Sequence, residues 1–334
     1  MAERRLTLAC GEYDRTRGLA DGTIAPGGIE LDYVALDPGE LFERVVRNRE
    51  FAVAEMSLST YLNLVARGDR GLVGIPAFPS RSFRHGCIWV HRDGRVRDPE
   101  DLVDARVGTL QYQLTLNLWL RGILEADHGV RPSDMTWVLG GQDAPGTRER
   151  APVDIPPDVR VELAPPGSTL GELLASGEID ALFAPHTPAI VRAGRPEIVR
   201  LFPDFRSTEV AWYRRTGLFP IMHLVVIRRA EYESDPWIAR SLFDAFCAAK
   251  AAALTRLRFT GTLAAMVPWL VAELESAEAL FGARFWPYGV EANRPELETA
   301  LRWARRQGIA IREVALEEVF AAETLSLTDP RPGA

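Results

Sequence analysis

Residues 6–16, LTLACGEYDRT, combine a short strand with a polar loop. The first five residues alternate in the manner of a half-buried β-strand, and Gly11 then ends the strand. The polar residues after Gly11 lie on the loop at the carboxyl end of the strand. Because α/β sheets bind ligands at this end of their strands, the stretch predicts an α/β fold with a ligand-facing loop.

The following residues continue the alternation of strands and helices. Residues 29–33 alternate as a second strand, residues 41–47 form an amphipathic helix, and residues 51–55 form a short buried strand. Residues 59–67 then form a helix that begins just after Ser57, a predicted N-cap. This order of elements predicts α/β lobes whose sheets are covered by helices on both faces.

Length and composition define the class of protein. A chain of 334 residues is long enough for two lobes, and its 47% hydrophobic and 25% charged residues are typical of a folded globular protein. The net charge of −7 comes without a long block of one sign, so we expect no nucleic-acid partner. The cysteines, Cys10, Cys87 and Cys247, are too widely spaced to predict a zinc site or a disulfide framework.

The amino terminus predicts the compartment. The polar start of the chain leads into the first strand without an apolar segment of the length that an export signal requires. The most apolar later stretch, residues 263–270, is short and is interrupted by Pro268, so it is unsuited to span a bilayer. We therefore expect a cytoplasmic protein with no membrane segment.

Five motifs occur together along the chain. They are residues 9–16 (ACGEYDRT), 54–59 (AEMSLS), 78–85 (FPSRSFRH), 215–223 (RTGLFPIMH) and 286–294 (WPYGVEANR). In this order the motifs resemble the 4,5-dihydroxyphthalate decarboxylase family, and the resemblance extends from about residue 6 to about residue 324.

The resemblance implies a two-lobed fold of the type 2 periplasmic-binding-protein class. Such a fold has two α/β lobes with mixed sheets, a ligand cleft between them, and a chain that crosses between the lobes twice. We place lobe one at residues 1–91 and 222–334 and lobe two at residues 92–221, with crossovers near His91 and Ile221.

The resemblance also implies a reaction, the non-oxidative loss of carbon dioxide from a hydroxylated aromatic dicarboxylate to give protocatechuate. The expected partner is thus a small aromatic carboxylate. Two alternatives remain on the same scaffold. One is a solute-binding protein for a small organic anion, and the other is a different lyase or hydrolase.

Aromatic decarboxylation requires an acid, a base and an anion clamp. Histidine is the easiest side chain to keep protonated beside anions, and His85 and His223 are the two candidates for the acid. Glu55, at a strand-to-helix turn, is the candidate base that takes a phenolic proton. The alternative for each histidine is a structural role, and the alternative for Glu55 is an ion pair with an arginine.

Further polar and aromatic residues lie where the predicted loops face the cleft. Arg81 and Arg84 precede His85, and their guanidinium groups suit bidentate contact with a carboxylate. The complete predicted set of substrate-binding residues is Tyr13, Asp14, Arg15, Ser57, Arg81, Arg84, Gln111, Tyr112, Gln113 and Thr115. Local ion pairs, helix capping and core packing are the structural alternatives.

No metal-binding motif occurs in the sequence. The histidines are widely spaced, without an HExxH or HxxxH arrangement, and there is no glycine-rich phosphate loop. We therefore expect a reaction without a cofactor. A homo-oligomer is compatible with the sequence.

Overall fold

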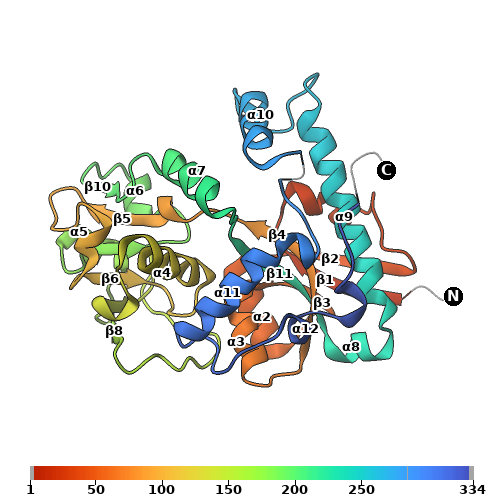
Figure 1. The fold of residues 1–334 in the computed structure, drawn as a ribbon, viewed down its shortest axis with the longest axis horizontal. Coiled ribbons are helices and arrows are strands. Elements are labelled where there is room, and N and C mark those ends of the chain that lie inside the picture. Colours follow the sequence, from red (N-terminus) through yellow and green to blue (C-terminus); the bar gives the residue numbers. More distant parts are fainter. Residues whose placement is uncertain (1–3, 284, 331–334) are drawn as a thin grey trace.

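Two separate sheets organise the chain into two lobes that lie side by side (Figure 1). The computed structural model describes residues 4–283 and 285–330. Both sheets are mixed, as expected for the predicted two-lobed α/β fold. Within the described residues, no helix has both the length and the apolar character needed to cross a membrane.

The first sheet has five strands in the order β2-β1-β3-β11-β4. β1 is parallel to β2 and β3, whereas β11 is antiparallel to β3 and β4. The strands are β1 (Arg4–Cys10), β2 (Ile29–Ala35), β3 (Val53–Ser57), β4 (Leu72–Arg81) and β11 (Ile221–Arg228). The carboxyl ends of β1 and β3 therefore lie at the same edge of the sheet as the start of β11.

Helices from both ends of the chain surround this sheet (Figure 1). The amino-terminal half contributes α1 (Arg17–Ala20), α2 (Pro38–Asn48) and α3 (Leu58–Ala66), and the carboxyl-terminal part contributes α8 (Arg229–Ser234), α9 (Trp237–Arg258), α10 (Leu270–Phe281), α11 (Arg294–Arg306) and α12 (Leu316–Val319). In α2, the apolar residues Leu41, Phe42 and Val45 recur at helical spacing and are buried. Sequence periodicity thus predicted which face of this helix packs inward.

The second sheet has six strands in the order β10-β5-β9-β6-β7-β8. Its strands are β5 (Ile88–His91), β6 (Arg106–Thr109), β7 (Thr136–Leu139), β8 (Arg160–Leu163), β9 (Ala181–Phe183) and β10 (Ile198–Arg200), and its helices are α4 (Thr115–His128), α5 (Leu170–Ser176), α6 (Ala189–Arg192) and α7 (Phe205–Thr216). Single 3-10 turns lie at Asp14–Thr16, His85–Cys87, Pro99–Leu102, Pro132–Asp134, Glu291–Asn293 and Ala322–Thr324.

The first crossover lies earlier than we predicted. β5 pairs with β9 and β10, so residues 88–91 belong to the second sheet and the predicted boundary at His91 is wrong. The reason is hydrogen bonding, because both edges of this buried strand find their partners in lobe two. The second crossover follows α7 and ends at Ile221, where β11 starts.

The lobes share a packed interface through α4. Leu116 and Leu120 belong to the core of lobe two, whereas Trp119 packs in the core of lobe one and its indole N–H donates to the carbonyl of Ile221 at 3.0 Å. A Cβ atom at Gly122 would lie 2.1 Å from the Trp303 ring. Glycine at this position therefore allows α4 to approach α11 closely.

Candidate active site

Glu55 and His223 form a hydrogen-bonded pair at the lobe-facing edge of the first sheet. His223 lies opposite Ser57 in the antiparallel ladder of β11 and β3, and Glu55 precedes Ser57 by two residues, so both side chains project from the same face. Nδ1 of His223 lies 2.6 Å from Oε1 of Glu55. Glu55 is fully buried, whereas the side chain of His223 retains 15% exposure.

Three more groups from the first loop bind the Glu55 carboxylate. The Tyr13 hydroxyl donates to Oε1 at 2.7 Å, the backbone N–H of Gly11 donates to Oε2 at 2.8 Å, and the Cys10 thiol lies 3.3 Å from Oε2. Burial by itself would raise the pKa of Glu55, but the hydrogen bond and charge of His223 and the donors on Gly11 and Tyr13 together hold this pKa below its ordinary value.

Saturation of the Glu55 carboxylate corrects its predicted role. With four donors around two buried oxygens, Glu55 cannot accept a proton from a ligand. Since the carboxylate is ionised, Nδ1 of His223 carries a proton, and the chemistry of the imidazole is left to Nε2. Glu55 therefore holds the imidazole of His223 in place rather than acting on a ligand.

Arg15 provides positive charge near this pair. Its guanidinium carbon lies 4.2 Å from the centre of the Tyr13 ring and 4.4 Å from the Trp286 ring, so the cation is held between two aromatic faces. Nη1 donates to Asp14 at 2.9 Å, and Nε donates to the carbonyl of Pro79. The structure therefore assigns Asp14 the predicted local ion pair. Our sequence analysis missed Trp286 as a site residue, although it begins the last of the five motifs.

A cluster of buried hydroxyl groups joins the lobes beside the pair. The Ser57 hydroxyl lies 2.9 Å from that of Thr115, and the Ser59 hydroxyl lies 3.0 Å from the same atom. Ser59 also donates from its backbone to the Thr115 hydroxyl at 3.1 Å. Ser57 and Thr115, both predicted to bind substrate, thus bind each other across the lobes.

The turn before α4 uses its polar groups internally. Gln111 donates to the carbonyl of Arg148, and Gln113 is buried and donates to the carbonyl of Ala151 at 3.1 Å. These two residues, predicted to hold a ligand anion, instead fix residues 147–151 of the same lobe. The backbone N–H of Tyr112 donates to the carboxylate of Glu149, so the chain's own anion occupies this position.

Tyr112, which we predicted to bind substrate, has the structural role that was the alternative, core packing. Its ring is fully buried, the Arg121 guanidinium lies 3.8 Å from the ring centre, and its hydroxyl donates to the carbonyl of Gln307 at 3.2 Å. An aromatic ring with a cation on its face and a satisfied hydroxyl is part of the core.

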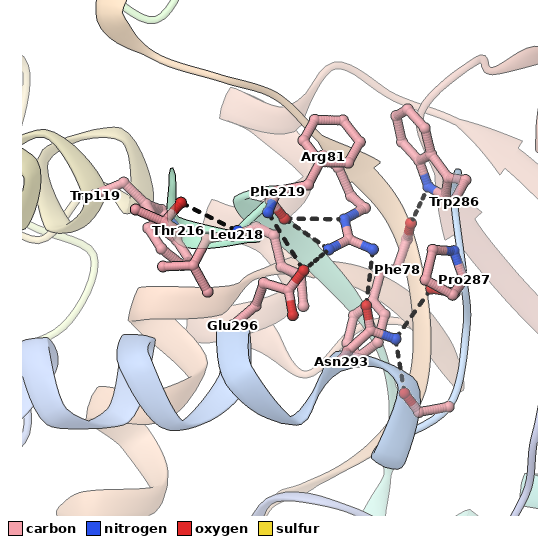
Figure 2. A network of polar contacts seen from close by, with 12 residues as sticks. Phe78, Arg81, Trp119, Thr216, Leu218, Phe219, Trp286, Pro287, Asn293 and Glu296 are labelled. Atoms are coloured by element: carbon pink, nitrogen blue, oxygen red, sulfur yellow. Dashed lines mark hydrogen bonds and ion pairs between the residues drawn. The ribbon is translucent and has the colours of Figure 1, made fainter. Parts of the chain in front are cut away.

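Arg81 is a structural residue at the crossovers, and its predicted role as an anion clamp is wrong. Figure 2 shows its guanidinium surrounded by acceptors: the carbonyl of Phe219 at 2.6 Å, Oδ1 of Asn293 at 2.7 Å and Oε1 of Glu296 at 2.8 Å. Every guanidinium nitrogen has a protein partner, so none is left for a ligand. Arg81 instead ties the end of β4 to the second crossover and to α11.

The guanidinium of Arg84 lies next to two sulfur atoms. Its Nε lies 3.0 Å from Sδ of Met222, and Nη1 lies 3.8 Å from Sγ of Cys87. Among the described residues no carboxylate lies within 4 Å of its guanidinium. Arg84 therefore has no ion pair among the described residues next to the start of β11, and its predicted contact with substrate stays a prediction.

His85 lies in an aromatic environment that does not suit a general acid. Its ring packs edge-on against Phe202 and Trp212, at centroid separations of 5.4 and 5.7 Å. Burial lowers the pKa of His85 to about 4 and raises that of Glu209, whose Oε1 is 3.8 Å away, to about 7. The imidazole of His85 is therefore neutral near pH 7, which does not suit the predicted role of an acid.

A hollow of about 540 Å³ borders Gly11 and Tyr13, which both donate to Glu55, and reaches the start of α2. The ring of Phe42, from α2, contacts the His223 ring edge-on at 4.8 Å. The guanidinium carbon of Arg150 lies 5.4 Å from the centre of the Phe42 ring. Arg150 belongs to the loop between β7 and β8.

Among residues 4–283 and 285–330, no group of three or more histidine, cysteine or acidic side chains is arranged to hold a metal ion. The three cysteines are free thiols, and two of them, Cys10 and Cys247, are buried.

The fold resembles that of solute-binding proteins. The periplasmic aliphatic sulphonate binding protein SsuA from Escherichia coli superimposes with a TM-score of 0.55 over 97% of this chain and 99% of its own, at 13% identity. A periplasmic sulfonate-binding protein SsuA from Methylobacillus flagellatus superimposes with a TM-score of 0.51 over 97% of this chain and 93% of its own, at 11% identity. These similarities confirm the predicted fold class.

Sequence comparison identifies the family. No protein-family model matches the chain. A 4,5-dihydroxyphthalate decarboxylase from Comamonas testosteroni is 37% identical over 325 residues, which cover 97% of this chain and 98% of the relative. A second protein of that name, from Pseudomonas putida, is 39% identical over 214 residues, which cover 64% of this chain and 83% of the relative. The chain belongs to the 4,5-dihydroxyphthalate decarboxylase family.

Proposed function

We propose that this protein is a decarboxylase of a hydroxylated aromatic dicarboxylate such as 4,5-dihydroxyphthalate, with protocatechuate as the product. Family membership supports the reaction. The observation that carries the assignment of the site is the 2.6 Å bond between Glu55 and His223, because it presents a positioned imidazole at the lobe-facing edge of the sheet.

The reaction needs one proton at one ring carbon. Nε2 of His223 delivers it to the carbon that bears the leaving carboxylate, and the hydroxyl para to that carbon supplies the electron pair. The carbon–carbon bond then breaks, carbon dioxide departs, and the bonding electrons restore the aromatic ring and the phenol. The substrate's own phenol acts as the electron source, so this route calls for no cofactor.

The protein environment favours this step. Glu55, held by Tyr13 and the Gly11 N–H, fixes the orientation of the His223 imidazole through its hydrogen bond to Nδ1. Arg15 adds positive charge that attracts the anionic substrate. The apolar ring of Phe42 beside the imidazole favours loss of the charged carboxylate as neutral carbon dioxide.

The test is turnover in heavy water. The purified protein is incubated with 4,5-dihydroxyphthalate in D₂O, and carbon dioxide and protocatechuate are followed. The product should carry one deuterium at the ring carbon next to the retained carboxylate, which proton NMR detects. Absence of carbon dioxide release would refute the proposed reaction.

The proton donor is tested with a histidine variant. His223→Asn should lower kcat by about 10²-fold or more and leave the dissociation constant for protocatechuate within a few-fold. His128→Asn is a matched control, because His128 pairs with the exposed Glu100 in lobe two. Near-normal turnover of His223→Asn would show that another group donates the proton.

A further inference from the structure

Arg150 is a cation without a counter-ion between the two lobes. Its side chain is half-buried, and no carboxylate oxygen of the described residues lies within 4 Å of it. The acidic side chains nearest to it have other partners, since Glu43 pairs with Arg47 and Glu149 accepts from the Tyr112 N–H. The guanidinium of Arg150 remains accessible and has no ion-pair partner among the described residues, so it can bind an anion from outside the chain.

The position of Arg150 relates it to the proton donor. The Phe42 ring contacts both the His223 ring and the Arg150 guanidinium. The centre of the Phe42 ring lies 4.8 Å from the centre of the His223 ring and 5.4 Å from the guanidinium carbon of Arg150. The guanidinium carbon therefore lies no more than about 10 Å from the imidazole centre, since the separation cannot exceed the sum of these two distances. One substituted benzene ring can therefore contact both groups.

The backbone around Arg150 is fixed. Thr147 donates to the carbonyl of Leu110, Gln111 donates to the carbonyl of Arg148, the Tyr112 N–H donates to Glu149, and Gln113 donates to the carbonyl of Ala151. The segment 147–151 is thus attached to the turn before α4 on both sides of Arg150. Such preorganisation lowers the entropic cost of binding a ligand.

We propose that Arg150 binds the carboxylate that the substrate retains and so makes the site specific for aromatic dicarboxylates. This inference rests on the proposed function and adds to it which group recognises the second carboxylate. A guanidinium on the leaving carboxylate would stabilise the ground state and slow the loss of carbon dioxide. On the retained carboxylate it binds substrate and product alike, and it turns the other carboxylate toward His223 and Phe42.

The test compares ligands with and without that carboxylate. Protocatechuate keeps it, and catechol lacks it but has the same two hydroxyl groups. Arg150→Gln should weaken protocatechuate binding by about tenfold or more in calorimetry, and the affinity for catechol should stay within about twofold. The KM for 4,5-dihydroxyphthalate should rise by a similar factor while kcat changes little, because the interaction is the same in the ground and transition states.

Two further variants sharpen the result. Arg148→Gln removes an exposed positive charge from the same segment and should change neither affinity. Arg150→Lys keeps the charge but loses the planar fork, so its affinity for protocatechuate should lie between those of the wild type and Arg150→Gln.

The outcomes separate the two proposals. Unchanged protocatechuate affinity in Arg150→Gln overturns the role of Arg150, and so does an equal loss of catechol affinity, which would mean that the residue maintains the shape of the site. If the wild type binds protocatechuate through Arg150 but releases no carbon dioxide from the dicarboxylate, the proposed reaction fails while the role of Arg150 stands.

Discussion

Nδ1 of His223 lies 2.6 Å from Oε1 of Glu55, although 168 positions separate the two residues in the sequence. Antiparallel pairing of β11 with β3 brings them together, and the surrounding sheet fixes the orientation of the imidazole. Both residues are anchored on strands rather than on loops, which favours a precise geometry for proton transfer.

Replacement of Glu55 tests its positioning role. Glu55→Gln keeps the size of the side chain but removes the charge that accepts the hydrogen bond of His223. We expect kcat to fall by about 10²-fold or more while the dissociation constant for protocatechuate stays within a few-fold. Steady-state kinetics together with calorimetry measure both. A rise in KM without a loss of kcat would contradict the role.

The stability of the same variant should depend on pH. The pKa of Glu55 in the folded protein lies below its ordinary value of 4.5, so its stabilising contribution is present above that pH and disappears as the pH falls through the lower, folded-state value. The difference in unfolding free energy between the wild type and Glu55→Gln should therefore shrink as the pH is lowered from about 7 to about 4 in urea titrations. A constant difference would show that the carboxylate charge contributes nothing.

Arg81 should be important for stability rather than for affinity. Arg81→Met leaves the Glu296 carboxylate buried without its cation, and breaking a buried ion pair in this way costs about 3 to 5 kcal/mol. Urea denaturation measures the loss. Arg294→Met is the control, because Arg294 forms only exposed ion pairs on the same helix, and it should change stability little. Equal losses for both variants would refute the structural role.

Glu209 should make the protein less stable in alkaline solution. Burial raises its pKa from 4.5 to about 7, so the folded state binds this proton more tightly than the unfolded chain. Its contribution is present at low pH and is lost as the pH rises through about 7. Glu209→Gln has no carboxyl group to titrate, so it lacks this loss of stability. The difference in Tm, Glu209→Gln minus wild type, should therefore increase between about pH 5 and about pH 8. A pH-independent difference would contradict the raised pKa.

Glu149 should act through the position of Arg150. Glu149→Ala removes the acceptor of the Tyr112 N–H and frees the neighbouring segment, so protocatechuate affinity should fall severalfold although the binding residue is intact. Glu149→Gln retains an oxygen acceptor and should bind nearly as the wild type does. Calorimetry measures both variants, and identical affinities for wild type and Glu149→Ala would show that this contact does not orient Arg150.

Local patterns in the sequence were sufficient for the elements of the fold. Alternating apolar residues and the break at Gly11 predicted β1 and its loop, and helical spacing predicted the buried face of α2. The motifs identified the family and drew attention to Glu55 and His223. These features depend on residues that are close together in the chain, which is why periodicity and motif order reveal them.

Only the tertiary structure determined which side chains meet and which remain available. Arg81 carries the charge expected of an anion clamp, but α11 returns from the far end of the chain and supplies Glu296 and Asn293 as its partners. His85 becomes a poor acid because residues of α7 and of the segment before α7 enclose its ring. Arg150 belongs to a loop that has no sequence pattern of its own, and it lies near His223 because the lobes pack together. Burial and long-range pairing control charge and pKa, and both arise from contacts between segments that are distant in the sequence.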